Sequence, residues 1–167
     1  MFETFYPDEY VESTYGIDFE KMYESGYRSV IFDIDNTLVP HDAPADANAV
    51  EFFKRLEKIG FKALVLSNNK EPRVKKFADA VGCMYIYKAN KPARGGYLRA
   101  MEKLGTNKEN TLFVGDQLFT DVWGARRTGI HSILVHPIDP KEEIQIVLKR
   151  YLEKIVLHFY KRRQLSD

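Results

Sequence analysis

The sequence predicts an α/β protein built around a mainly parallel β-sheet. Short runs of β-branched and aromatic residues alternate with longer amphipathic stretches, which is the order expected of repeated strand–helix–strand units. The short runs are apolar throughout, as is typical of strands buried on both faces of a sheet. A glycine closely follows each of the four central amphipathic stretches, and glycine there commonly ends a helix.

The expected elements follow one another at regular intervals along the chain. The predicted strands cover residues 30–32, 63–66, 85–87, 112–114 and 133–135. The predicted helices between them cover about 47–59, 71–81, 93–104 and 119–128. The glycines that end these helices are Gly60, Gly82, Gly105 and Gly129.

The two ends of the chain differ from this central pattern. Residues 1–17 are aromatic and acidic without a clear period, so we expect an extended arm, followed by a short helix over 18–25. From about 141 to 163, apolar residues recur at steps of three and four, which predicts a long amphipathic helix. Because no repeat or low-complexity linker interrupts the sequence, we expect residues 1–167 to form a single domain.

Composition excludes several classes of protein. Lys and Arg total 25 and Asp and Glu total 24, which leaves a formal net charge of +1, so we expect no nucleic-acid partner. The single cysteine, Cys83, excludes an internal disulfide framework and a cysteine-based zinc site within one chain. The acidic N-terminus is unlike a secretory signal, and no apolar run approaches the ~20 residues that span a bilayer. We therefore expect a cytoplasmic protein.

Four polar clusters stand directly after the predicted strands or a few residues beyond them. In open α/β sheets, ligands bind beyond the carboxyl ends of the strands, so these clusters are the candidate site. In chain order they are Asp33-Ile-Asp35-Asn-Thr37, Ser67-Asn68-Asn69, Lys91-Pro92, and Gly115-Asp116 with Asp121.

The charges of these clusters predict a bound cation. Asp33 and Asp35 are two residues apart on an extended chain, so both carboxylates can project to the same side. Two such anions at ~4 Å repel by roughly 4 kcal/mol at an effective dielectric near 20. Asp116 and Asp121 add negative charge, while Lys91 is the one matching base among the clusters. A divalent metal is therefore expected, and the oxygen ligands favour Mg²⁺ over zinc or copper.

Such a site suits phosphoryl transfer. A carboxylate can attack phosphorus and form an aspartyl-phosphate, and a second carboxylic acid can protonate the leaving oxygen and later activate water. The Ser67 hydroxyl can hold phosphoryl oxygens, and Lys91 can neutralise the charge that develops on them. We also expect Thr37 and Asn68 to contact the substrate.

The four clusters together resemble the four motifs of the haloacid dehalogenase (HAD) superfamily. More closely, the stretch from Ile17 through Val39, with Ser67-Asn-Asn, Asn90-Lys-Pro and the segment from Gly115 to Asp121, resembles the YqeG-type phosphatases of HAD subfamily IIIA. The resemblance implies the three-layer, Rossmann-like fold of that superfamily.

The resemblance also implies roles for individual residues. Asp33 is the expected nucleophile and a metal ligand. Asp35 is the expected general acid and base, and its backbone carbonyl is the second metal ligand. Asp116 is expected to bind the metal directly, and Asp121 to act through water or by orienting its neighbours. The acid at Asp35 favours a phosphatase over a dehalogenase, because a halide leaves without a proton. By the same resemblance, Ser67 binds the phosphoryl group and Lys91 stabilises its charge.

Motif spacing limits the substrate. Only residues 38–66 separate Thr37 from Ser67, and only 70–90 separate Asn69 from Lys91. Since domains begin at roughly 50 residues, we expect no cap domain and an open site, either for a large substrate or completed by a second subunit in a homo-oligomer. YqeG-type relatives in mitochondria and plastids dephosphorylate phosphatidylglycerophosphate, so we expect that lipid or another large phosphorylated molecule. The alternative is a catalytically weak adaptor or regulatory protein that binds phosphate or metal.

Charge is unevenly distributed between the ends of the chain. Residues 1–26 carry seven acids and one base, whereas residues 148–163 carry six bases and one acid. The two segments can simply attract each other, and the C-terminal helix can simply cover the sheet. A basic amphipathic helix can also lie on anionic lipid, which would place the protein at the periphery of a membrane. The sequence leaves these alternatives open.

Overall fold

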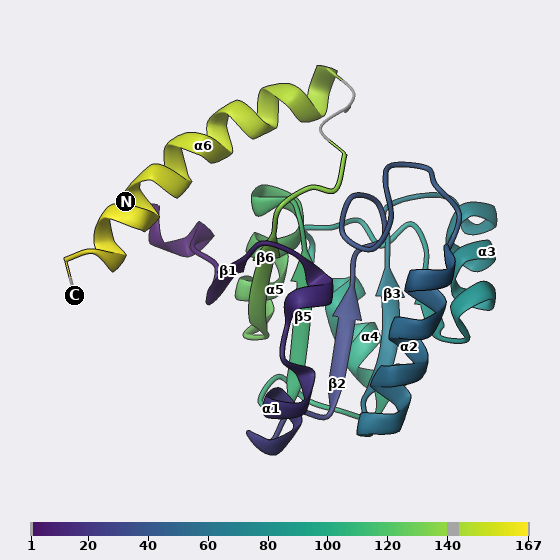
Figure 1. The fold of residues 1–167 in the computed structure, drawn as a ribbon. Helices are drawn as coiled ribbons and strands as arrows, with labels where there is room; N and C mark the ends of the chain where they lie inside the picture. Colours follow the sequence, from purple (N-terminus) through teal and green to yellow (C-terminus); the bar gives the residue numbers. More distant parts are fainter. Residues whose placement is uncertain (1, 140–143, 167) are drawn as a thin grey trace.

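The computed structural model describes residues 2–139 and 144–166 and contains a six-stranded sheet (Figure 1). The strand order is β1-β6-β5-β2-β3-β4, and every neighbouring pair is parallel. The strands are β1 (Glu9–Val11), β2 (Ser29–Phe32), β3 (Lys62–Leu66), β4 (Met84–Ile86), β5 (Thr111–Gly115) and β6 (His131–Val135). The predicted α/β class and parallel sheet are confirmed.

Helices cover both faces of this sheet. They are α1 (Phe19–Glu24), α2 (Ala47–Ile59), α3 (Glu71–Val81), α4 (Arg94–Leu104), α5 (Trp123–Thr128) and α6 (Ile144–Gln164). Successive side chains of a strand point to opposite faces. Phe32 therefore packs with α1, α2 and α3 on one face, while its neighbour Ile31 packs with α4 and α5 on the other. The four central helices end at glycines with positive φ, as predicted.

The segments between the first strands contain no inserted domain. All residues from β2 to β4 are described, and they form a loop, α2, β3 and α3. The capless architecture that the motif spacing predicts is therefore present. Because β2 pairs in parallel with β3 and β5, the loops after these three strands lie together at the carboxyl edge of the sheet.

One predicted helix differs in its first turn. The sequence predicts a helix over 119–128, but Leu118–Val122 forms a π-helical turn, η3, before α5 begins at Trp123. The wider turn is closed by the N–H of Val122, which donates to the carbonyl of Gln117 at 3.2 Å. Such π turns are often found at functional sites, and this one contains a predicted site residue.

The N-terminal arm is more ordered than the sequence predicts. It contains two 3₁₀ turns, η1 (Glu3–Phe5) and η2 (Thr14–Gly16), and between them β1 extends the sheet next to β6. Asp8 fixes this edge, because its carboxylate accepts from the N–H and the hydroxyl of Ser132 at 2.7 and 2.9 Å. A three-residue strand has no recognisable period, and its partner is far away in the sequence, so the pairing was not predictable.

Helix α6 lies beyond the carboxyl ends of the strands and runs outward along the N-terminal arm (Figure 1). It begins at Ile144, and residues 141–143 of the predicted helix lie outside the described residues. Val156 packs with η3 and β6, and Tyr160 packs against Tyr6 with ring centroids 5.3 Å apart. An ion pair of 2.5 Å joins Arg163 to Glu3, so the basic and acidic ends of the chain meet.

No helix among the described residues combines the length and the apolar character that a membrane crossing requires.

Candidate active site

The loop after β2 turns sharply and brings a threonine back to the first aspartate. The turn depends on Asn36, which has a φ of 63° and donates its N–H to the carbonyl of Val39 at 2.7 Å. Asparagine tolerates this left-handed backbone better than most residues. The Thr37 hydroxyl consequently lies 3.4 Å from Oδ2 of Asp33 and 3.2 Å from Oδ1 of Asp116. The loop thus bridges the ends of β2 and β5.

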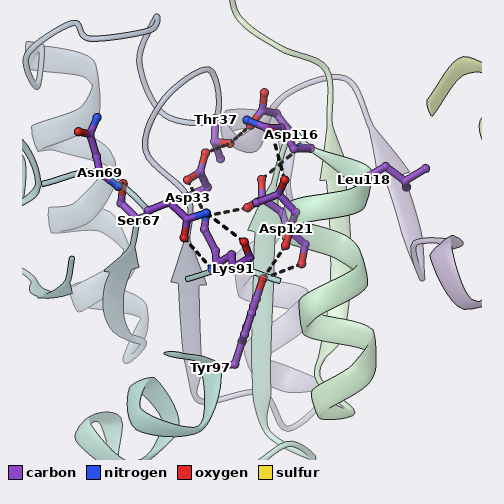
Figure 2. A network of polar contacts seen from close by, with 12 residues as sticks. Asp33, Thr37, Ser67, Asn69, Lys91, Tyr97, Asp116, Leu118 and Asp121 are labelled. Carbon is purple, nitrogen blue, oxygen red and sulfur yellow. Dashed lines mark hydrogen bonds and ion pairs between the residues drawn. The ribbon is translucent and has the colours of Figure 1, made fainter. Parts of the chain in front are cut away.

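Lys91 stands between two of the predicted aspartates (Figure 2). Its Nζ lies 2.7 Å from Oδ1 of Asp33 and 2.7 Å from Oδ1 of Asp121. The ammonium group is buried, and burial alone would lower its pKa, but Asp121 and Asp33 raise the pKa above its ordinary value. Lys91 is therefore held as a cation at the centre of the site.

The loop after β3 positions this lysine. The side-chain amide of Asn68 donates to the carbonyl of Lys91 at 3.1 Å and accepts from its N–H at 2.7 Å. The substrate contact expected for Asn68 stays a prediction, and the bonds observed give it a positioning role. Ser67 lies at the same edge (Figure 2), where its buried hydroxyl accepts from the N–H of Asn69 at 3.1 Å. That hydroxyl still has its own proton to donate.

The loop after β5 supplies the other two aspartates. Asp116 directly follows the strand, and η3 turns Asp121 back so that its Oδ2 accepts from the N–H of Gln117 at 3.1 Å. Glycine is required before Asp116, because a Cβ on Gly115 would lie 2.6 Å from Cβ and Oδ2 of Asp121. The close approach of the strand to this carboxylate explains the Gly-Asp pair.

Three buried carboxylates form a group that fits a metal ion. Oxygens of Asp33, Asp116 and Asp121 lie within 4.8 Å of one another. Burial raises the pKa of Asp33 to about 6, with Lys91 opposing the rise and Asp121 adding to it. Burial, Asp33 and Asp121 raise the pKa of Asp116 well above its ordinary value, against the opposing effect of Arg150. An all-oxygen group that needs more positive charge suits a hard dication such as Mg²⁺.

Arg150 of α6 also reaches this group, which the sequence did not predict. Its guanidinium contacts Oδ2 and the backbone carbonyl of Asp116, and it lies 3.1 Å from Oε2 of Glu153. Glu153 in turn accepts from the N–H of Leu118 at 2.8 Å. In the sequence Arg150 is one of the six bases of residues 148–163, but in the structure it turns inward to the buried Asp116, 34 positions away in the sequence.

Asp35 lies outside the carboxylate group and is held by a different cation. Its Oδ1 lies 3.0 Å from Nη2 of Arg73 and accepts from the N–H of Asp42 at 2.8 Å. The side chains of Asp35 and Arg73 are 17% and 16% exposed, so this pair stands at the rim of the site. Arg73 was not predicted. Its place in the first turn of α3, just after Ser67-Asn-Asn, is a signal that could have identified it.

A buried tyrosine supports the site from beneath. The Tyr97 hydroxyl lies 3.1 Å from the carbonyl of Thr120 and 3.0 Å from that of Asp121 (Figure 2). The ring has room because position 124 is a glycine, where a Cβ would collide with the tyrosine. Tyr97 therefore fixes the backbone of the π turn that presents Asp121.

Comparison with known proteins decides the family. The family model for haloacid dehalogenase-like hydrolases matches residues 41–129. The chain is 39% identical over 160 residues to "Probable phosphatase YqeG" of Bacillus subtilis (strain 168), a match that covers 95% of this chain and 93% of that protein. The chain belongs to the HAD superfamily. It is a HAD phosphatase, and the predicted resemblance to the YqeG type is confirmed.

Two further comparisons describe this HAD phosphatase. "Phosphatidylglycerophosphate phosphatase 1, chloroplastic/mitochondrial" of Arabidopsis thaliana is 29% identical over 165 residues, covering 90% of this chain and 46% of that protein. The chain thus spans about half the length of that relative. A crystal structure of a HAD phosphatase from Thermococcus onnurineus has a TM-score of 0.57 at 15% identity, covering 70% of this chain and 89% of that one. The likeness shows the HAD fold.

Proposed function

We propose that this HAD phosphatase hydrolyses phosphate monoesters with Mg²⁺ and through an aspartyl-phosphate on Asp33. The observation that carries the proposal is the buried group of Asp33, Asp116 and Asp121, in which burial and the neighbouring carboxylates raise the pKa of Asp33 and of Asp116. These carboxylates, with the backbone carbonyl of Asp35, would hold the ion. When bound, Mg²⁺ supplies positive charge that attracts the phosphate and stabilises its transition state.

Asp33 carries out the covalent step, and Asp35 carries out the proton transfers. The Asp33 carboxylate attacks phosphorus, the ester P–O bond breaks, and the leaving oxygen takes a proton from Asp35. Asp35 then accepts a proton from the water that attacks the aspartyl-phosphate, which releases inorganic phosphate and restores Asp33. The bonds of Asp35 to Arg73 and Asp42 both end on Oδ1, so Oδ2 is the oxygen that can carry this proton.

The surrounding side chains bind and orient the phosphoryl group. Lys91 brings a buried positive charge to within 2.7 Å of the nucleophile, where it opposes the charge that develops on phosphoryl oxygens. The proton of the Ser67 hydroxyl is available to one of those oxygens. Thr37, which lies between Asp33 and Asp116, orients both carboxylates and contributes a hydroxyl to the substrate side.

We propose phosphatidylglycerophosphate as the substrate. The name of the Arabidopsis relative supports this choice, and so does the lack of any domain-sized insertion over residues 33–83, which leaves the site accessible to a phosphate on a large assembly. The catalytically weak adaptor remains the competing function. It predicts that metal and phosphate bind without turnover.

The test combines a variant with a substrate panel. Asp33→Asn should lower aryl phosphate hydrolysis at least ~1,000-fold while the circular dichroism spectrum stays that of the wild type, because the covalent step is lost and the shape is kept. Asp79→Asn, on the exposed side of α3, is the matched control and should retain activity. Among phosphatidylglycerophosphate, sugar phosphates, nucleotides and phosphopeptides, kcat/KM should be highest for the lipid.

Two outcomes of this test would count against the proposal. Turnover by Asp33→Asn at the wild-type rate would remove the aspartyl-phosphate mechanism. Binding of Mg²⁺ and phosphate without hydrolysis of any ester by the wild type would favour the adaptor.

A further inference from the structure

We propose that α6 docks on an anionic phospholipid bilayer through an exposed apolar stripe. The stripe is defined by six side chains that are between 43% and 66% exposed: Val147, Leu148, Tyr151, Leu152, Ile155 and Phe159. Scattered single apolar residues are normal on a protein surface, but a continuous row on one element marks an interaction site. The proposal extends the proposed action on a phospholipid, on which it rests for the identity of the partner.

The stripe and the packed side of α6 face in different directions. Glu153, Val156 and Tyr160 are buried and repeat at steps of three and four, so they form the side that packs on the body. Leu148 and Leu152 are each two positions from Arg150, which corresponds to about 200° of rotation around the helix. Since Arg150 reaches Asp116, the stripe points away from the site and into solvent.

The exposed charges of α6 are all positive. Between Val147 and Ser166, Glu153 is the one acid in the sequence, and it is buried against Leu118. The bases with side chains in solvent are Lys149, Lys154, Lys161 and Arg162, and the exposed Arg163 is paired with Glu3. An apolar row bordered by bases is complementary to anionic headgroups above an apolar layer. A second copy of this chain would instead place bases against bases, so it is the less favourable occupant.

The position of α6 means that docking would bring the bilayer close to the carboxylate group. Arg150 and Glu153 fix the helix over the loop after β5, at the carboxyl edge where the carboxylate group lies. A bilayer on the outer side of α6 would thus lie about one helix diameter, roughly 10 Å, from that edge. A phosphorylated headgroup could reach the site around the helix without leaving the membrane surface.

The first test measures co-sedimentation of the full chain with phosphatidylglycerol vesicles and with phosphatidylcholine vesicles. The wild type should sediment with the anionic vesicles and not with the neutral ones. The stripe variant replaces three residues with glutamine, which preserves helix propensity: Leu148, Leu152 and Ile155. The control variant replaces three exposed apolar residues elsewhere: Met84, Tyr87 and Leu98. Binding should fall at least tenfold in the stripe variant and stay unchanged in the control.

The second test isolates charge. Replacing Lys149, Lys154 and Arg162 with glutamine should weaken binding roughly 100-fold at low salt, since each base contributes about fivefold near an anionic surface. The control replaces Lys54, Lys58 and Lys76, which are exposed on α2 and α3. It should bind like the wild type.

Hydrolysis of a soluble aryl phosphate separates this inference from the proposed function. The stripe variant should keep the wild-type rate on that substrate, because none of its substitutions touches the site. A protein that binds anionic vesicles but hydrolyses no phosphate ester would refute the proposed function and still support lipid docking by α6.

Three results would overturn the proposal that α6 docks on an anionic bilayer. The first is a wild type that ignores anionic vesicles, and the second is equal loss of binding in the stripe and control variants. The third is a wild-type dimer in light scattering that becomes a monomer in the stripe variant, because a second copy would then be the occupant.

Discussion

Arg150 links α6 to the carboxylate group, and replacing it should strengthen Mg²⁺ binding while it weakens the fold. Arg150→Met removes the cation that contacts Asp116 and keeps most of the apolar stem. Without metal, Asp116 and Glu153 both lose a buried partner. Breaking a buried pair costs about 3 to 5 kcal/mol, and the 15% exposure of Arg150 favours the lower end.

The loss should depend on the metal. In EDTA we expect the free energy of unfolding to fall by about 3 kcal/mol, or roughly 6–12 °C in thermal midpoint for a chain of this size. In saturating Mg²⁺ the ion itself compensates Asp116, so the loss should shrink to about 1 kcal/mol, the share of Glu153. The difference of about 2 kcal/mol must reappear as Mg²⁺ binding that is roughly 30-fold tighter in the variant.

Urea unfolding with EDTA or Mg²⁺ measures the first quantity, and isothermal titration of Mg²⁺ into the folded protein measures the second. Arg162→Met, exposed on the same helix, is the control and should change neither. Equal destabilisation in EDTA and in Mg²⁺, with unchanged or weaker metal binding, would refute this reasoning. Arg150 would then orient Asp116 for the ion rather than compete with it.

Three further predictions concern residues around the site. Gly115→Ala places a Cβ 2.6 Å from the side chain of Asp121, so kcat on an aryl phosphate should drop about 100-fold; a loss below threefold would contradict the contact. Tyr97→Phe removes the hydroxyl from beneath the π turn and should lower the free energy of unfolding in urea by about 1 kcal/mol, whereas an unchanged value would mean that water replaces it. Burial raises the pKa of Tyr15 to about 12, so the folded state keeps this proton longer than the unfolded chain. The wild type should therefore lose stability above about pH 10 more steeply than Tyr15→Phe, and superimposable pH profiles in urea would disprove it.

The central helices and strands were predictable because local rules decide them. The helices over 47–59 and 71–81 have the predicted bounds, since a capping side chain or a proline begins each one and a glycine ends it. The strands differ from the prediction by one or two residues, as continuous apolar runs have blurred ends. The π turn at the start of the last predicted helix was missed, because a single turn is too short to show a period of its own.

The grouping of Asp33, Lys91, Asp116 and Asp121 follows a general rule of parallel sheets. Residues that follow neighbouring parallel strands meet at one edge of the sheet, so the sequence alone predicts that these four lie together. The contacts of Arg73 and Arg150 do not follow from this rule, although the place of Arg73 just after Ser67-Asn-Asn is a signal for it. Each depends on where a helix packs, and the packing of α6 on η3 and the N-terminal arm involves segments from opposite ends of the chain.

The α/β class, the parallel sheet and the acidic edge with its lysine follow from the order of residues alone, because they depend on local periodicity and on the common direction of the strands. Tertiary packing alone decided which cation faces each carboxylate and which side of α6 stays in solvent. The cause is burial. Asp116 needs a charged partner only because the fold removes water from it, and Arg150, distant in the sequence, then supplies the charge.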